Sequence, residues 1–212
     1  MKKERNANLT LEQILEIKTL KSNLDRMVVF ASGKGSNFHA LAQHFSTQIE
    51  ALVCNREDAP VIEIAKKYNI SCYVIPHKNY STRSEHEIAV WNELNKINSF
   101  QFIVLAGYMR VLSPTFFEKL GQKKIINLHP AHLEDYKGAH AYEFAVEHKF
   151  PRWGLSVHDV TPKLDSGALI HSTEFAIFPY ESVEQLKSRV QKIEHNLLVE
   201  SVQSIFNKKR KQ

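Results

Sequence analysis

The first part of the chain alternates between short apolar runs and stretches with helical spacing. The apolar runs are rich in β-branched residues, as buried parallel strands are, and they cover residues 27–32, 49–55, 71–76, 100–107 and 124–129. Apolar residues recur at helical spacing over 37–45, 59–68 and 81–97, and Ser81 is suited to cap the last of these helices. Strands and helices that take turns predict a doubly wound, mostly parallel α/β sheet of Rossmann-like form.

The rhythm changes after residue 129. Residues 138–149 have helical spacing, two alternating runs follow at 153–160 and 168–178, and a long helical pattern covers 181–206. A short polar segment joins the two alternating runs, so we expect an antiparallel extension of the sheet with Asp165 displayed in the connecting loop. A further helical stripe at 9–24 precedes the first strand, and it predicts an extra helix that packs on the domain or on a second subunit.

The positive charge of the chain gathers at its ends. The formal net charge is +5, but residues 1–5 and 208–212 hold seven of the 28 Lys and Arg residues and one of the 23 acidic residues. The part between them has 21 basic and 22 acidic residues. A folded surface that binds nucleic acid normally has a concentrated basic stripe. We therefore expect no nucleic-acid partner.

Hydropathy and cysteine content indicate the cellular compartment of the protein. No window reaches the ~18 consecutive apolar residues of a membrane span, and the polar start MKKERNANLT lacks the apolar segment of a secretory signal. The only cysteines, Cys54 and Cys72, have the spacing of neither a metal site nor a disulfide framework. We expect a soluble, cytoplasmic protein with no membrane partner.

The stretch KKIINLHPAH places two polar side chains at the end of the fifth apolar run. Residues i and i+2 of a strand point to the same face, so Asn127 and His129 project side by side before Pro130 ends the strand. An amide N–H suits an oxygen that gains negative charge, an imidazole exchanges protons near neutral pH, and Asp165 could orient that imidazole. This Asn–His–Asp trio contains no nucleophile, so it fits acyl transfer to a substrate amine. A helix cap for Asp165 and a core hydrogen bond for His129 are the structural alternative.

A glycine-rich turn follows the first apolar run and opens a helix. Its residues are Gly33, Lys34, Gly35, Ser36 and Asn37. Backbone N–H groups in such a turn approach an anion closely, and the positive end of the helix dipole favours the same position. The spacing is neither a dinucleotide fingerprint nor a Walker A motif, so it indicates one phosphate of a mononucleotide-like ligand. A purely structural turn is the alternative from the loop alone.

Five motifs in chain order resemble the phosphoribosylglycinamide formyltransferase family. They are FASGKGSN, VLAGYMRVLSP, INLHPAHLEDYKGAHAY, SVHDVTPKLDSGALI and VQKIEHNLL. The match runs from about Met27 to Ile205, so the resemblance implies a formyltransferase domain at 27–207. The helical stripe predicts a helical extension at 1–26, which has no counterpart in the family, and the charges at the end predict a basic tail at 208–212. The resemblance also implies a reaction in purine (IMP) biosynthesis, the transfer of a formyl group from the cosubstrate 10-formyltetrahydrofolate to the amine of glycinamide ribonucleotide. Small molecules are then the expected partners of a monomer or homodimer, and no metal is expected.

The resemblance also implies roles for individual residues. Asn127, His129 and Asp165 match the catalytic residues that assist a tetrahedral intermediate, and Gly33 to Asn37 match the loop that binds the substrate phosphate. Gln191 and Glu194 match the ribose side, Met109, Arg110, Val111 and Leu112 match the folate-binding segment, and His140 and His158 match positions near the active site.

The chain departs from the family pattern at several positions. Lys34 stands where Asn is usual, His132 and Glu134 replace residues of a Ser-Leu-Leu-Pro stretch, and His171 stands where Gln is common. None of these changes removes a member of the trio. His129 and His132 also spell His-x-x-His, but a metal site would need a further ligand, and Pro130 argues against a helix that would align them.

Four other functions remain possible at this point. A transferase acting on a nucleotide-linked amino sugar would keep the trio without needing this phosphate loop. A methionyl-tRNA formyltransferase is expected to have a basic carboxyl-terminal domain, and a formyltetrahydrofolate hydrolase a regulatory domain larger than 26 residues. A binding protein without catalysis would not require all three members of the trio.

Overall fold

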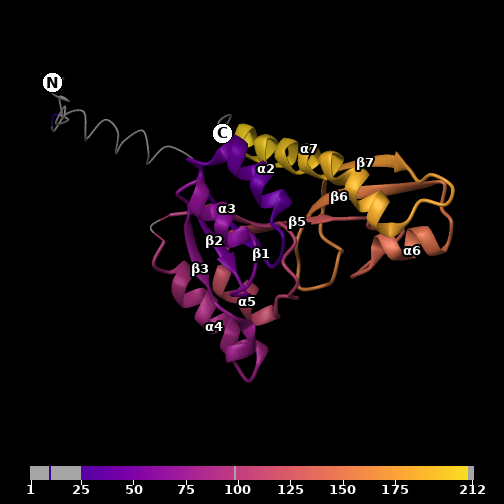
Figure 1. Cartoon of the computed structure of the whole chain (residues 1–212). Helices are drawn as coiled ribbons and strands as arrows, with labels where there is room; N and C mark the ends of the chain where they lie inside the picture. The colour runs from indigo at the N-terminus through magenta and orange to yellow at the C-terminus, as the bar shows by residue number, and fades with distance from the viewer. Residues whose placement is uncertain (1–9, 11–24, 98, 210–212) are drawn as a thin grey trace.

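One seven-stranded sheet organises the molecule (Figure 1). The computed structural model describes residues 10, 25–97 and 99–209, so the predicted helix at 9–24 lies, apart from Thr10, outside the described residues. The strands are β1 (Met27–Ala31), β2 (Ile49–Cys54), β3 (Ser71–Val74), β4 (Phe102–Leu105), β5 (Lys124–His129), β6 (Arg152–Asp159) and β7 (Leu169–Ala176). Their order is β3-β2-β1-β4-β5-β6-β7, parallel from β3 to β5 and antiparallel from β5 to β7. The predicted parallel sheet with an antiparallel extension is therefore confirmed.

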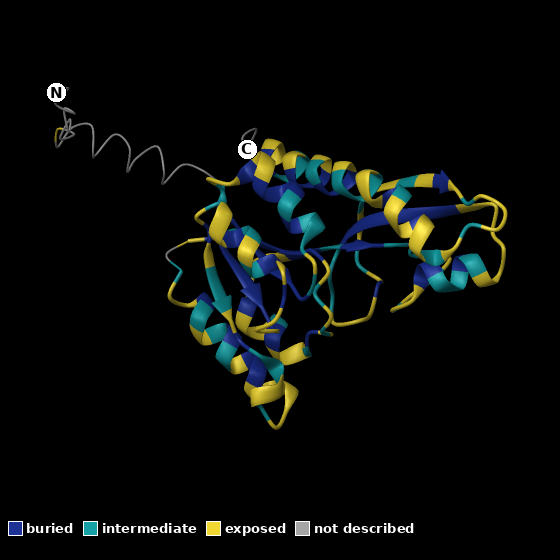
Figure 2. Cartoon of the chain, viewed as in Figure 1, coloured by how far each residue is buried: buried dark blue, intermediate teal, exposed yellow. Residues whose placement is uncertain are grey.

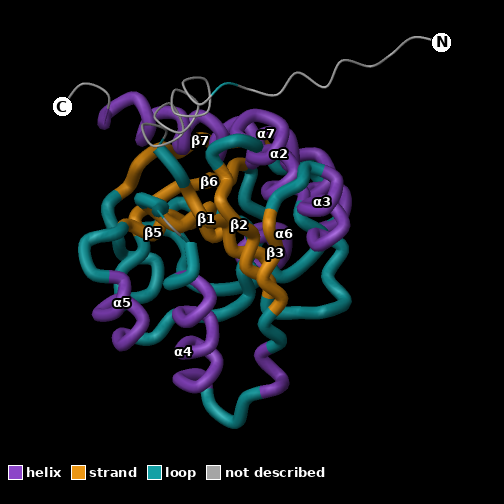
Figure 3. Tube along the Cα trace, turned by 90° about the vertical axis from the view of Figure 1, so that its left-hand side faces the viewer, coloured by secondary structure: helices purple, strands orange, loops and turns teal. Residues whose placement is uncertain are grey.

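Helices cover both faces of the parallel half (Figure 3). They are α2 (Ser36–Phe45), α3 (Val61–Lys67), α4 (Arg83–Leu94), α5 (Pro114–Leu120), α6 (Ala141–Glu147) and α7 (Val183–Lys209), with a 3-10 turn η1 (His77–Asn79) after β3. Helices α2, α3 and α7 lie on one face, and α4 and α5 lie on the other. The long α7 then runs across the antiparallel half, where α6 also packs against it (Figure 1).

The two faces of β1 explain why its sequence is continuously apolar. Met27, Val29 and Ala31 pack into the cluster with α2, α3 and α7, whereas Val28 and Phe30 pack into the cluster with α4 and α5. All five are fully buried, and the central strands are dark blue in Figure 2. Burial of each of the larger side chains, Met27, Val28, Val29 and Phe30, contributes about 1.5–3 kcal/mol. A strand covered on both faces therefore has no polar positions to alternate with.

The start of α4 corrects one prediction. The N-cap is Thr82, one residue after the predicted Ser81. The Thr82 hydroxyl accepts from the backbone N–H of Glu85, and the Glu85 carboxylate accepts from the N–H of Thr82 in return. The reciprocal box needs a carboxylate three residues after the cap, which Thr82 has and Ser81, followed by Ser84, does not.

The carboxyl-terminal helix includes part of the predicted basic tail at 208–212. Helix α7 continues to Lys209, so the first residues of the predicted basic tail extend it, and 210–212 lie outside the described residues. No helix in the described ranges combines the length and the apolar character that a membrane span requires.

Candidate active site

The carboxyl end of β5 presents two polar side chains on the face opposite α7. Ile126 and Leu128 pack into the core beneath α7, so Asn127 and His129, which alternate with them, point to the other face. Asn127 pairs in register with His158 of β6. The strand thus places an amide and an imidazole side by side, as the spacing predicts.

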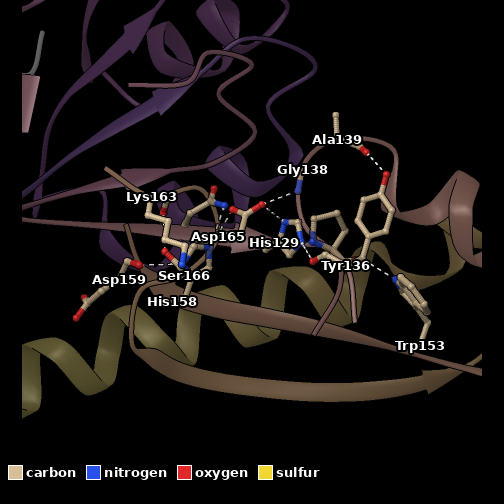
Figure 4. Close-up of polar contacts among 12 residues, drawn as sticks. His129, Tyr136, Gly138, Ala139, Trp153, His158, Asp159, Lys163, Asp165 and Ser166 are labelled. Carbon is tan, nitrogen blue, oxygen red and sulfur yellow. Dashed lines mark hydrogen bonds and ion pairs between the residues drawn. The ribbon is translucent and has the colours of Figure 1, made fainter. Parts of the chain in front are cut away.

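The His129 ring lies between two acceptors. It is 3% exposed, its Nε2 lies 3.0 Å from the carbonyl oxygen of Tyr136, and its Nδ1 lies 3.7 Å from Oδ2 of Asp165 (Figure 4). Nε2–H donates to the Tyr136 carbonyl, which fixes the ring orientation. The 3.7 Å contact is longer than a hydrogen bond, so Nδ1 is not engaged by the Asp165 carboxylate and is available to a ligand.

The Asp165 carboxylate is held by a loop that only particular residues can form. Its backbone has φ +42°, a left-handed conformation that Asp tolerates better than most residues, and its Oδ2 accepts a 2.7 Å hydrogen bond from the N–H of Gly138. Gly167 follows closely, and a Cβ there would lie 1.7 Å from the carbonyl oxygen of Asp159. Asp165 and Gly167 thus suit the backbone that brings the Asp165 carboxylate back to β5.

His158 joins the trio from the neighbouring strand. It is 1% exposed, and burial lowers its pKa, so the ring is neutral at pH 7. Its Nδ1–H donates to the carbonyl oxygen of Asp159 at 2.8 Å, which leaves Nε2 as an acceptor 3.4 Å from Nδ2 of Asn127. The same Nε2 lies 3.7 Å from Oδ1 of Asp165. His158 thus orients the Asn127 amide, whose second N–H remains available.

A pocket of about 520 Å³ opens beside Asp165. Ser156, His132 and Leu169 also line it, and the buried hydroxyl of Ser156 has no hydrogen-bond partner within the described part of the chain. His132 turns toward Glu174, with Nε2 3.3 Å from Oε1, and not toward His129. Among the described residues, no group of three or more His, Cys, Asp or Glu side chains could hold a metal ion.

The glycine-rich turn lies at the amino-terminal end of α2. Gly35 is the N-cap, with φ +77°, and a Cβ there would lie 2.5 Å from Cγ2 of Val61, so this glycine is needed by the backbone itself. Gly33 has open space around it, and its carbonyl accepts from the N–H of Val61. No side chain caps α2. Its first N–H groups are therefore available to an anion beside the exposed Lys34.

A carboxylate from α7 reaches this turn. Glu194 Oε2 accepts from Nδ2 of Asn37 at 3.5 Å, and Oε1 accepts from the Tyr142 hydroxyl at 2.5 Å. Burial raises the pKa of Glu194. A partly buried carboxylate beside an anion-binding turn suits neighbouring hydroxyl groups of a ligand. Gln191, also on α7, is exposed and contacts neither Glu194 nor Asn37 in the described hydrogen bonds.

The segment from Met109 to Leu112 follows β4. Met109 is 78% exposed and Val111 is 55% exposed, whereas Leu112 is buried and Arg110 is half-buried. Exposed apolar side chains on a short ordered segment are suited to contact a flat ligand. Gly33, Met109 and Pro130 each follow the carboxyl end of a parallel strand, and β1 and β4 are the strands where the sheet order reverses, the usual position of a ligand crevice.

Three predicted or noted histidines have different surroundings. His140 caps the start of α6 with φ +70°, its side chain is 78% exposed, and it lies 4.0 Å from Glu143, not against the trio. His171 joins β7 to α7 through a 3.2 Å contact with the Ser201 hydroxyl. His158, in contrast, touches both Asn127 and Asp165.

Sequence reasoning did not find several residues that hold the site. Tyr136 and Gly138 contact His129 and Asp165 through backbone atoms, for which side-chain identity gives no signal. Tyr142 bonds Glu194 from α6, and only the fold brings these two helices together.

Comparison with known proteins identifies relatives over most of the chain. The formyl transferase family matches residues 25–202. The phosphoribosylglycinamide formyltransferase of Dictyostelium discoideum is 33% identical over 200 residues, which cover 85% of this chain and 97% of that protein. The trifunctional purine biosynthetic protein adenosine-3 of Chironomus tentans is 37% identical over 177 residues, 80% of this chain but 13% of that protein, so the chain spans about an eighth of it.

Solved structures agree with the sequence comparison. The phosphoribosylglycinamide formyltransferase of Campylobacter jejuni superposes with a TM-score of 0.78 at 35% identity, over 86% of this chain and 97% of that one. Both the fold and the sequence over the described domain are thus shared with enzymes that carry this printed name.

Proposed function

The chain belongs to the formyl transferase family, and on that premise we propose that it transfers a formyl group from 10-formyltetrahydrofolate to the amine of glycinamide ribonucleotide in purine biosynthesis. One observation carries the proposal. Asn127, His129 and Asp165, supported by His158, converge at the carboxyl end of β5. The anion-binding turn after β1 lies at the same edge of the sheet.

The ribonucleotide is bound through its phosphate and ribose. The backbone N–H groups of Gly33 to Asn37 and the start of α2 hold the phosphate, and Lys34 adds a positive charge near it. Glu194 accepts from the ribose hydroxyls, since the carboxylate of its charged form has acceptor sites beyond those used by Tyr142 and Asn37. Gln191 lies on the same helix and contributes to the same side.

The formyl donor lies against the segment after β4. Met109 and Val111 offer exposed apolar surface to the ring of the folate, and backbone groups of Arg110 and Leu112 make its polar contacts. This arrangement brings the formyl group toward Asn127, between the two ligands.

The transfer is an addition followed by an elimination. The ribonucleotide amine attacks the formyl carbon, a C–N bond forms, and the carbonyl oxygen becomes an oxyanion. The free N–H of Asn127 and the Nδ1–H of protonated His129 donate to that oxygen, and one such donor is typically worth ~10²- to 10³-fold in rate. The bond from the formyl carbon to N10 of the folate then breaks, and the proton lost by the amine passes to N10.

Asp165 and His158 act on these two donors. The negative charge of Asp165 stabilises protonated His129 and helps relay the proton, and the neutral His158 holds the Asn127 amide. In this proposal the chain's own donors supply the charge stabilisation. We expect the protein to act in the cytoplasm on small molecules, as a monomer or homodimer.

The test consists of two parallel absorbance assays. Purified protein is mixed with a stable 10-formyl folate analogue, with and without glycinamide ribonucleotide, and deformylation is followed. Turnover that requires the ribonucleotide is the expected result. Turnover without it would indicate a hydrolase instead, and no turnover in either sample would indicate another amine acceptor or a binding role, to be separated by offering other amines.

A further inference from the structure

Two buried polar residues lie directly behind the proposed ligand crevice. Ser32 and Asn55 are the first residues after β1 and β2, and each is 2% exposed. The Ser32 hydroxyl donates to Oδ1 of Asn55 at 2.5 Å, and the Ser32 oxygen accepts from the backbone N–H of Met109 at 2.8 Å. Burying a serine and an asparagine is costly unless they are hydrogen-bonded to each other or to the backbone. Here their bonds point to the segment after β4.

The direction of the bonds from Met109 through Ser32 to Asn55 follows from the donor and acceptor groups involved. Met109 N–H can only donate, so the Ser32 oxygen accepts and its own hydrogen is free for Asn55. The Asn55 oxygen therefore faces Ser32, and its amide nitrogen faces Nδ1 of His77 at 3.2 Å. That ring nitrogen also lies 3.0 Å from the Asn55 carbonyl oxygen, so His77 supports the amide only in the tautomer with a lone pair on Nδ1. The bonds of Ser32 to Met109 and to Asn55 do not depend on the tautomer of His77.

The Met109 backbone is held at two points as a result. The N–H of Ser32 donates to the carbonyl oxygen of Gly107 at 3.1 Å, while the Ser32 hydroxyl binds the N–H of Met109. Gly107 has φ +78°, so the turn between these two bonds is sharp. These two bonds fix the backbone at Met109 while its side chain stays exposed. The side chain is therefore preorganised for an apolar contact with a ligand.

We propose that Ser32 and Asn55 are positioning residues that fix the backbone of Met109 and so set the affinity for the formyl donor. The inference rests on the proposed function, because it takes the Met109 segment to be the donor site. Asn55 contacts Ser32, and Ser32 contacts Met109. A substitution of Asn55 therefore affects the binding site of the formyl donor through Ser32.

The test substitutes Asn55 and measures each substrate separately. For Asn55→Ala, we expect the KM for the formyl donor to rise about 3- to 10-fold, the effect of one lost hydrogen bond. We expect the KM for the ribonucleotide to change by less than about 2-fold, and kcat at saturating donor to stay within about 2-fold of the wild type, since the N–H of Met109 donates to Ser32 and not to the trio or Glu194. A merely structural role would lower the fraction of active enzyme, and therefore kcat, and would leave both KM values unchanged. Asn79→Ala is the matched control, because Asn79 is an exposed residue of the turn that contains His77.

A second measurement does not depend on catalysis. Hydrogen exchange of the Met109 amide, followed by NMR, is expected to be slow in the wild type and in Asn79→Ala and about 10-fold faster in Asn55→Ala. Unchanged exchange and an unchanged donor KM would overturn the proposal, as would an equal rise in both KM values. If the wild type shows no transfer at all, the proposed function fails; direct binding of the folate analogue to wild type and Asn55→Ala then decides the inference, and equal affinities would overturn it.

Discussion

At the scale of single residues, the proposed site holds two polar side chains in place and leaves part of their hydrogen-bonding capacity unused. The Nε2–H of His129 is used by the Tyr136 carbonyl and one N–H of Asn127 by His158. The second N–H of Asn127 and the Nδ1 of His129 have no partner within hydrogen-bond distance among the described residues. Neighbouring groups therefore fix the orientation of both donors without consuming them. Preorganised donors of this kind need no rearrangement when charge develops on a substrate oxygen.

Asp165→Asn tests the electrostatic part of this arrangement. The amide can occupy the space of the carboxylate, and its oxygen can still accept from Gly138, but it has no charge to stabilise protonated His129. We expect kcat to fall by at least ~10²-fold while the thermal unfolding midpoint stays within a few degrees. Exposed Lys163 lies in the same loop, and Lys163→Ala serves as the control. Near-normal turnover of Asp165→Asn would contradict the assignment.

The sequence predicts some of these residues and not others, for physical reasons. Asn127 and His129 follow from strand periodicity, which is local. Their contact with Asp165 depends on a left-handed residue and on Gly167 beside Asp159, and their contact with His158 depends on the register of β5 and β6. No local pattern contains that information. Ser32 and Asn55 each follow a buried strand as one ordinary polar residue, so only the fold shows that they meet.

At the scale of elements, the turn between β1 and α2 contains two glycines with different roles. Gly35 is required by the backbone conformation, and Gly33 leaves room for a ligand. Gly35 has φ +77° and would place a Cβ 2.5 Å from Cγ2 of Val61, whereas Gly33 has open space. We expect Gly35→Ala to lower the free energy of unfolding by about 1–3 kcal/mol. Gly33→Ala is expected to cost less than about 1 kcal/mol and to weaken mainly the binding of the ribonucleotide. Urea unfolding and ribonucleotide titration separate the two outcomes, and equal losses of stability would contradict the structural distinction. It follows that Gly35 is a poor position at which to test phosphate binding.

The cap of α4 is a second prediction at this scale. Thr82→Ala removes one half of the capping box with Glu85, and we expect a loss of about 0.5–2 kcal/mol in unfolding free energy. Ser81→Ala is the matched control, because Ser81 contributes a backbone N–H to Glu85 that alanine retains. Chemical unfolding of both variants checks this, and a larger loss for Ser81→Ala would show that the cap is misassigned.

At the scale of the whole molecule, the order of the elements and the parallel and antiparallel halves of the sheet were predictable, whereas the order of the strands within the sheet was not. Five continuous apolar runs and two alternating runs predict the seven strands, because burial on two faces leaves a continuous apolar run. Helical spacings predict α2, α3, α4, α6 and α7. The reversal of strand order at β1 and β4, which brings the turn after Ala31 beside the segment after Leu105, depends on crossover connections that periodicity does not encode.

Burial of neutral histidines makes the stability of the whole domain depend on pH. Burial lowers the pKa of His86 and of His158 below the ordinary value of 6.5, and both rings are almost fully buried. Below pH 6.5 the unfolded chain binds protons that the folded chain does not, so folding stability rises with pH up to about 6.5 and is lost as the pH falls from there toward the folded pKa values. Glu194 acts in the opposite direction, since burial raises its pKa and its contribution falls as the pH rises above 4.5. Burial also lowers the pKa of His195, so three histidines oppose one carboxylate, and each titrating group changes stability by at most about 1.4 kcal/mol per pH unit.

We therefore expect the urea midpoint to fall between about pH 7.5 and pH 5.5, and His86→Gln to reduce that fall. His86 lies outside the proposed active site, and its Nε2–H donates to the carbonyl oxygen of Ile75 at 3.0 Å. A glutamine amide can make the same bond but takes up no proton in this range. The variant should therefore be close to the wild type near pH 7.5 and more stable than the wild type near pH 5.5. If the wild type and the variant lose equal stability over this interval, the prediction is contradicted. His86 would then take up its proton in the folded protein as it does in the unfolded chain, or a more distant charge would offset the effect of burial on its pKa.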